Sequence, residues 1–274
     1  MIGLWILMSG SLLVPFPGQP DIYLEIHDLD ADDRVVFVAP HQTERVMNQA
    51  LIEMVPNSRA RFVVIRQSGT RNLRLDIRDH EVWVDPNRIY TPCGAEASVF
   101  DLNEDMNDLD IMAQAAEMAY EVGKFVTRYL RSETEVVWVA LHNNTEGYDD
   151  DGHGGIGTVS ILRYLDRLNW GAKYLTQVTV GPMDEDDLFW TTHSDDHDWL
   201  KWSGFNAVHQ NPAVATIEDE DDGSLSVFAE MRQVRYFNIE AERFDPETGK
   251  GVDHRYSQGL MLDAVLRLIG GIHD

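Results

Sequence analysis

Short apolar runs, rich in β-branched and aromatic residues, alternate along this chain with longer segments of helical periodicity. The runs have the length and composition of buried strands and occupy residues 35–38, 61–66 and 135–141. Apolar side chains recur at helical spacing in residues 43–55, 111–130 and 258–268. No Pro/Ser-rich linker or internal repeat interrupts the alternation. The pattern predicts one α/β domain with a central mixed, largely parallel sheet flanked by helices.

Weaker patterns predict the remaining elements. Residues 72–77 and 81–84 alternate as two short strands, with Arg78-Asp79-His80 as the turn between them. Residues 91–108 carry Pro92, Gly94 and several acids, which favours a loop. We expect the last strands at residues 225–229 and 234–241.

The N-terminal segment admits two interpretations. Residues 4–14 are apolar and have the length of a signal-peptide core, but no Lys or Arg precedes them. They are too few to span a membrane, so no stable membrane insertion is expected. We therefore divide the chain into residues 1–20, an export signal or first strand, and residues 21–274, the single domain. The first interpretation implies a periplasmic or exported protein and the second a cytoplasmic one.

Charge and cysteine content narrow the classes of partner and site. The net charge is −25, from 47 acidic and 22 basic residues, and this argues against a nucleic-acid partner, which requires a basic patch. Cys93 is the one cysteine, which excludes both a disulfide framework and a Cys-rich zinc site. Neither property fixes the oligomeric state.

Two of the apolar runs are followed by a histidine. His41 and Glu44 lie at the transition from the run at residues 35–38 to the predicted helix at residues 43–55, and His142 ends the run at residues 135–141. In an open α/β sheet, ligands bind at the carboxyl ends of the strands. If both strands are central and parallel, His41, Glu44 and His142 meet at one edge. Two imidazoles and a carboxylate with an open fourth position form the usual ligand set of a catalytic Zn²⁺.

The order of the polar motifs resembles that of the zinc metallocarboxypeptidase superfamily. That family carries a His-x-x-Glu motif, a Val-Asp-Leu-Asn-Arg stretch, a distal His after a strand, and a Glu on a late strand. The matching residues here are His41 and Glu44, Val84-Asp85-Pro86-Asn87-Arg88, His142 and Glu240. The resemblance covers residues 35 to 242 and implies a zinc-dependent hydrolase that cleaves an amide bond next to a free C-terminal carboxylate. An exported enzyme of this kind suits cell-wall peptides.

The resemblance also implies roles for individual residues. Asn87 and Arg88 would bind the substrate carboxylate, for which the guanidinium fork is well shaped. Arg71 would polarise the scissile carbonyl, with Arg74 as the alternative. Glu240 would be the general base. Its competitor is Glu242, on the same face of a predicted strand, and Glu230 is a more remote choice.

Some residues depart from the family pattern and leave alternatives open. Pro86 replaces the usual Leu, and no Tyr upstream of Glu240 clearly matches the family's substrate-binding Tyr. The stretch Leu141-His142-Asn143-Asn144-Thr145 is similar to the succinylglutamate desuccinylase and aspartoacylase branch, which hydrolyses N-acyl amino acids, although Gln42 replaces the Gly usual in that branch. The expected partner is therefore a small peptide or an N-acyl amino acid. An inactive binding module on the same fold is the remaining alternative.

Overall fold

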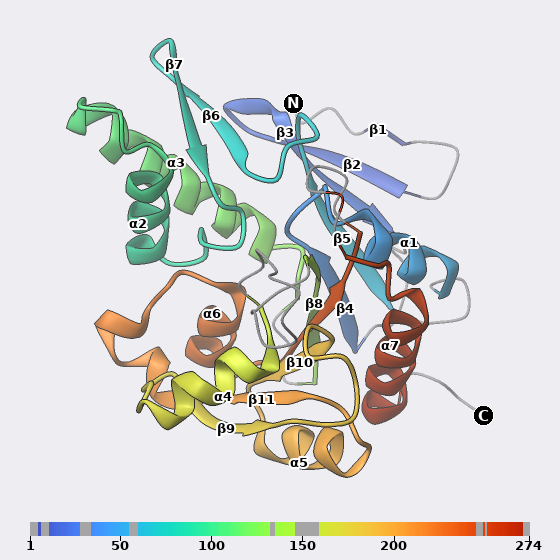
Figure 1. Ribbon diagram of the computed structural model, residues 1–274. Coiled ribbons are helices and arrows are strands. Elements are labelled where there is room, and N and C mark those ends of the chain that lie inside the picture. Colours follow the sequence, from blue (N-terminus) through green and yellow to red (C-terminus); the bar gives the residue numbers. More distant parts are fainter. Residues whose placement is uncertain are drawn as a thin grey trace.

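The computed structural model describes residues 5–6, 11–27, 34–54, 60–131, 135–145, 159–244, 249 and 251–270. Within them, one mixed sheet has the strand order β1-β2-β3-β5-β4-β8-β12-β10-β11-β9 (Figure 1). Its centre is parallel and consists of β5 (Arg61–Arg66), β4 (Val35–Ala39), β8 (Val137–Asn144) and β12 (Arg235–Glu242). The predicted fold class, an α/β domain around a mixed sheet, is confirmed.

Mostly antiparallel strands extend this sheet on both flanks. One flank holds β1 (Trp5–Ile6), β2 (Ser11–Phe16) and β3 (Gln19–His27). The other holds β10 (Leu188–Thr191), β11 (Ala207–Gln210) and β9 (Leu175–Thr179), of which β10 and β11 are parallel to each other. Part of the apolar N-terminal stretch therefore pairs in the sheet, and its role as an export signal stays a prediction.

A separate hairpin stands beside the sheet. It consists of β6 (Leu73–Ile77) and β7 (His80–Val84), close to the predicted strands. Arg78 and Asp79 have φ values of 47° and 69°, the left-handed conformation that a tight two-residue hairpin turn requires. The turn predicted at these residues is confirmed.

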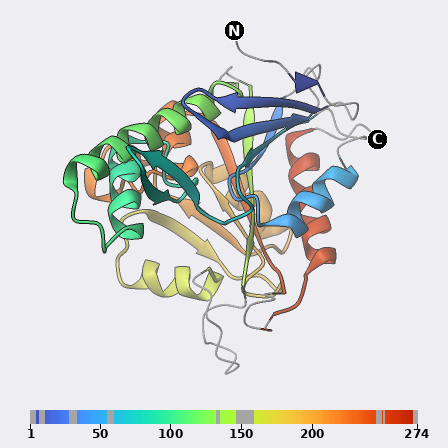
Figure 2. The same ribbon diagram turned by 90° about the horizontal axis from the view of Figure 1, so that it is seen from above.

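Helices cover both faces of the sheet, as Figure 2 shows. One apolar cluster packs α2 (Pro92–Leu102), α3 (Leu109–Thr127) and α6 (Leu225–Arg232) against side chains such as Val36 and Trp138. The cluster on the opposite face packs α1 (Arg45–Met54), α5 (Ser194–Trp202) and α7 (Arg255–Ile269) against side chains such as Phe37 and Val139. Alternate residues of each central strand thus point into different layers.

Smaller elements complete the far flank of the sheet. Helix α4 (Ile161–Asn169) packs against β9, and two 3₁₀ turns, η2 (Pro212–Ala215) and η3 (Glu218–Glu220), precede α6. None of the helices described is both long and apolar enough to cross a membrane.

Two of the predicted elements are wrong. Residues 91–108 contain helix α2, whose start is fixed by Thr91: its Oγ1 accepts from the Gly94 N–H, and Pro92 follows at the first helical position. The predicted strand at residues 225–229 is helix α6, capped by Ser224. Its buried residues, Leu225, Val227 and Ala229, have the alternate spacing of a strand, so the apolar pattern is misleading there.

Candidate metal centre

His41, Glu44 and His142 meet because β4 and β8 are parallel neighbours. Val38 pairs with Ala140, so the carboxyl ends of the two strands lie side by side. His41 and Glu44 occupy the short connection between β4 and α1. The sequence predicts that the second strand stops at His142, but β8 continues to Asn144. The pleat of β8 therefore sets the direction in which the His142 side chain leaves the backbone.

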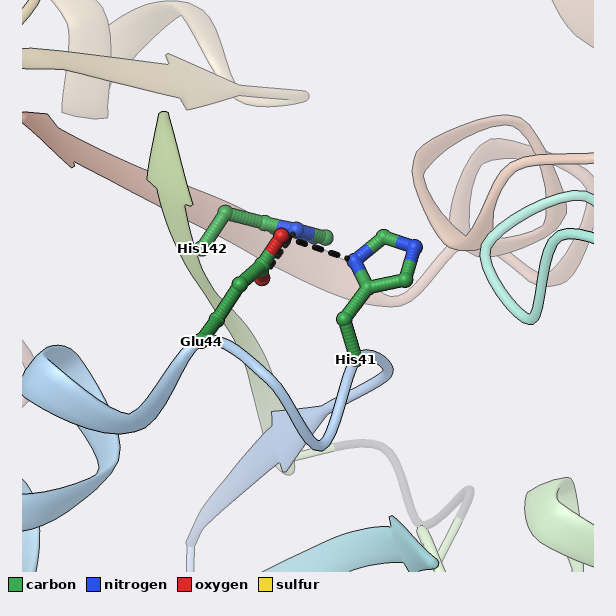
Figure 3. A group of neighbouring side chains, drawn as sticks. All are labelled: His41, Glu44 and His142. Atoms are coloured by element: carbon green, nitrogen blue, oxygen red, sulfur yellow. Dashed lines mark ion pairs between the residues drawn. The ribbon is translucent and has the colours of Figure 1, made fainter. Parts of the chain in front are cut away.

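Glu44 lies between the two imidazoles, as Figure 3 shows. Its Oε1 is 3.0 Å from His41 Nδ1, and its Oε2 is 3.0 Å from His142 Nδ1. The ring centroids of the two histidines are 5.2 Å apart. All three side chains are almost completely buried.

Neither contact between Glu44 and a histidine has hydrogen-bond geometry. His41 Nδ1 is buried without a hydrogen-bond partner although Glu44 Oε1 is near, and Glu44 Oε2 is buried without one although His142 Nδ1 is near. An unsatisfied buried polar group costs about 1–3 kcal/mol. One ligand atom from each of the three residues lies within 4.8 Å of the others. Two nitrogens and a carboxylate oxygen that face a common position suit Zn²⁺, so the residues fit the ion that the sequence predicts.

Asp85 contacts the outer side of His41 and has no role in the sequence prediction. Asp85 Oδ1 is 2.8 Å from His41 Nε2. Burial raises the pKa of Asp85, but the charge and hydrogen bond of His41, together with Arg71 and the Asn87 N–H, hold that pKa below its usual range. The ionised carboxylate can only accept, so Nε2 carries the proton and Nδ1 is left facing Glu44. Carboxylates behind histidine ligands orient them in this way. The sequence feature that could have pointed to this role is the position of Asp85 in the same motif as Asn87 and Arg88.

Electrostatics favour a cation between these residues. Burial raises the pKa of Glu44, but the charges of His41 and His142 outweigh burial and hold it well below the usual value. Burial also lowers the pKa of His41, but Glu44 and Asp85 outweigh it and raise that pKa to about 9. The group thus keeps two carboxylates ionised and attracts positive charge. A proton supplies that charge when no metal does, so metal binding would release protons.

Of the two candidate arginines, the structure brings Arg71 to the group. Its guanidinium donates to Glu44 Oε1. Arg74 instead forms ion pairs on the hairpin, 3.0 Å from Glu81 and 3.4 Å from Asp76.

Of the three candidate bases, Glu240 is the one beside the group. It pairs with His142 across β12 and β8, and the Asn238 amide donates to its Oε1 at 3.0 Å. Burial, together with the charge of Glu44, raises the pKa of Glu240 against the effect of His142.

The other two candidate bases have different neighbours. Glu242 lies 3.1 Å from His254 Nε2 and accepts the Val252 N–H at 2.9 Å. Burial raises the pKa of Glu230, on α6, to about 7 against its hydrogen bond with Gln210.

Asn87 and Arg88 follow Asp85 on the loop between β7 and α2. Arg88 forms an ion pair with Asp222, with Nη1 and Oδ2 2.8 Å apart, and both side chains are partly exposed. Asn87 donates its backbone N–H to Asp85 Oδ1 at 2.8 Å, and its side-chain oxygen is buried without a partner. The acidic, Gly-rich loop after His142 lies mostly at residues 146–158, outside the described residues.

No family model and no curated protein matches the sequence. Similar solved structures include succinylglutamate desuccinylase from Vibrio parahaemolyticus, at 12% identity and a TM-score of 0.43 over 100% of this chain and 78% of that chain. Cell shape determinant protein Csd4 from Helicobacter pylori is 12% identical, with a TM-score of 0.44 over 90% of this chain and 55% of that chain. Gene product Atu2144 from Agrobacterium tumefaciens is 12% identical, with a TM-score of 0.46 over 90% and 93% of the two chains.

This chain spans about half the length of the Csd4 structure. Another Csd4 structure is described as that of a D,L-carboxypeptidase. At identities near 12%, none of these likenesses transfers an activity, so any function must be argued from the residues of this chain.

Proposed function

We propose that this protein is a zinc-dependent hydrolase that cleaves an amide bond next to a free carboxylate. The observation that carries the proposal is the buried meeting of His41, Glu44 and His142, whose ligand atoms face one another without hydrogen-bond geometry. Buried ionisable groups in such an arrangement are typical of functional sites.

His41, Glu44 and His142 would hold the zinc ion, and Asp85 would fix the His41 ring. Bound there, zinc supplies a Lewis acid that polarises a carbonyl and lowers the pKa of water. Asp85 contributes by keeping the proton of His41 on Nε2, at 2.8 Å, so that Nδ1 remains free to act as a ligand.

Glu240 would take the proton from the attacking water and deliver it to the leaving amine. Its position beside His142 supports this role, as does the upward shift of its pKa, which makes the ionised carboxylate a stronger base. The amide of Asn238 would hold the Glu240 carboxylate in place.

Arg71 would stabilise the negative charge that develops on the carbonyl oxygen, and its contact with Glu44 supports that position. Asn87 and Arg88 would bind the free carboxylate of the substrate, with Arg88 leaving Asp222 to do so. The substrate is then a peptide with an open C-terminus, and a cell-wall peptide if the protein is exported.

The test combines metal analysis with a substrate panel. The purified protein should contain about one zinc per chain, and it should hydrolyse peptides with a free C-terminus but not the same peptides amidated at that end. Glu240→Gln should retain the zinc and lose at least about 100-fold in kcat, the usual contribution of a general base. His80→Ala, at an exposed position of the hairpin, is the matched control. Hydrolysis of N-acyl-aspartate or N-succinyl-glutamate but not peptides would replace the peptidase by a deacylase, and ligand binding without turnover would indicate a binding module.

A further inference from the structure

A pocket of about 330 Å³ opens between β10, β11, α4 and the acidic segment at residues 219–222. One wall is aromatic: Trp190 stacks on Tyr174 with ring centroids 6.1 Å apart, and Tyr164 meets Trp190 edge-on at 5.2 Å. The Trp190 indole N–H donates to Gln210 Oε1 at 2.9 Å, which holds the ring in place. None of these side chains has a role in the proposed hydrolysis.

Two structural links connect this pocket to the metal centre. Along the sheet, Trp190 pairs with Asn238, the amide of Asn238 donates to Glu240, and Glu240 pairs with His142. Paired residues of neighbouring strands point to the same face, so the pocket wall and His142 share one face. Along the chain, the loop that places Asp85 on His41 also places Arg88 at the pocket.

The charges of the pocket are mainly negative. Residues 219–222 contribute four carboxylates, against the guanidinium groups of Arg88 and Arg167. Arg88 is paired with Asp222 at 2.8 Å, and Arg167 donates to the Tyr174 hydroxyl at 2.7 Å. The pocket therefore offers more negative groups than its own cations can neutralise.

The backbone fixes the acidic segment against the loop that carries Arg88. Gly223 has φ +71°, and a Cβ at this position would lie 2.3 Å from the carbonyl oxygen of Arg88. The Tyr90 N–H donates to the Gly223 carbonyl at 3.1 Å, and Thr91 Oγ1 donates to Asp221 Oδ1 at 2.7 Å. Asp222 is thus held next to Arg88 by contacts that do not involve either of their side chains.

We propose that this pocket binds the last residue of the substrate and selects a residue that carries a side-chain cation, an ammonium or guanidinium, beside its free carboxylate. The proposal rests on the proposed function, because it takes Arg88 as the group that binds the carboxylate. When the substrate carboxylate pairs with Arg88, Asp222 loses its ion-pair partner. A neutral side chain leaves that charge uncompensated, whereas a cationic side chain pairs with it.

The aromatic wall of the pocket also favours a cationic side chain. The faces of Trp and Tyr rings attract cations, and the attraction strengthens where the ring is partly desolvated. Trp190 is half-buried and Tyr174 is stacked on it, so a cation that enters the pocket meets aromatic rings on one side and carboxylates on the other. An end group that carries both a carboxylate and a side-chain cation can therefore pair with Arg88 and Asp222 at the same time, so that neither charge is left without a partner.

Calorimetric titration with lysine and with norleucine, which has the same carbon chain without the ammonium, tests the proposal without turnover. We expect lysine to bind about 10-fold more tightly, the effect of one exposed ion pair and one cation–π contact. Asp222→Asn should weaken lysine binding and strengthen norleucine binding, because it frees Arg88 in the ligand-free protein. Asp263→Asn, which removes an exposed carboxylate on α7, should change neither.

Equal binding of the two ligands by the parent protein would overturn the proposal, as would changes of the same sign in Asp222→Asn. Peptides that end in lysine or norleucine separate this result from the proposed function. Hydrolysis of both at equal kcat/KM contradicts the pocket and supports the hydrolase. No hydrolysis of either, with the binding preference intact, contradicts the hydrolase and supports the pocket.

Discussion

Two groups of histidine and carboxylate side chains lie near the carboxyl ends of β8 and β12, and they are built differently. In the candidate metal centre, two imidazoles flank the carboxylate of Glu44. In the second group, which we name the ion-pair cluster, His254 lies between Asp187 and Glu242, 3.0 Å and 3.1 Å from their oxygens. The candidate metal centre thus has more imidazoles than carboxylates, whereas the ion-pair cluster has more carboxylates than imidazoles.

The difference decides what each group can bind. Both ring nitrogens of His254 face carboxylates, and the hydrogen bond to Asp187 raises the pKa of His254 to about 9 against burial. Asp184 also lies near Glu242 and His254, at distances a metal could bridge. Its ligand atoms would be one imidazole nitrogen and two carboxylate oxygens, and carboxylates suit Mg²⁺ or Ca²⁺, whereas imidazole suits Zn²⁺. We therefore expect the ion-pair cluster to bind Zn²⁺ less well than the candidate metal centre, which offers two imidazoles.

Replacing one histidine in each group tests this difference with the largest expected effect. His142→Ala should weaken zinc binding by at least about 100-fold, since even the loss of a residue behind a ligand costs 10–100-fold. His254→Ala should leave zinc affinity unchanged, because His254 is not among the three candidate ligands. Competition with a fluorescent chelator measures both. Zinc loss in His254→Ala, or retention in His142→Ala, would reverse the assignments.

The ion-pair cluster should make the free energy of unfolding depend on pH. A His254 pKa of about 9 lies above the unfolded value of 6.5, so protonated His254 stabilises the fold fully below pH 6.5. That stabilisation, about 3 kcal/mol, is lost as the pH rises through 9. Urea unfolding of the parent and His254→Gln should therefore differ most at pH 6 and least at pH 10. A difference that does not change with pH would show that His254 acts only through packing.

The carboxylates behind the histidines should also differ between the groups. Asp85→Asn should weaken zinc binding by about 10–100-fold, because it no longer holds the His41 proton on Nε2. Asp187→Asn should lower stability and leave zinc binding unchanged. Measuring zinc affinity and urea unfolding for both variants gives the comparison, and equal zinc affinities for the two would contradict it.

The smallest effect is expected at Arg74, the alternative to Arg71. Arg74→Ala removes exposed ion pairs with Asp76 and Glu81 and should cost about 0.2–1 kcal/mol of stability. Its kcat should equal that of the parent, whereas Arg71→Ala should lower kcat. Kinetics on a single peptide substrate decide this, and a larger loss of kcat in Arg74→Ala than in Arg71→Ala would exchange their roles.

The fold class could be predicted from the sequence, and so could the three residues that the structure brings together in the candidate metal centre. Buried parallel strands need apolar side chains on both faces, so β4, β5 and β8 are continuous apolar runs that are visible without a structure. His41 and His142 each stand at the end of such a run. Because parallel neighbouring strands bring their carboxyl ends together, the position along the chain already implied proximity.

Other contacts could not be predicted from the sequence, because they depend on how distant segments pack together. Strand alternation puts Glu240 and Glu242 on the same face, so the sequence does not distinguish them. In the structure, His142 lies beside Glu240 and His254 beside Glu242. Arg88 meets Asp222 because Gly223 allows two distant loops to approach closely. Strand periodicity specifies the face to which a side chain points, whereas the fold specifies which neighbour it meets there. Helices α2 and α6 were missed because caps and burial, rather than an apolar stripe, determine them.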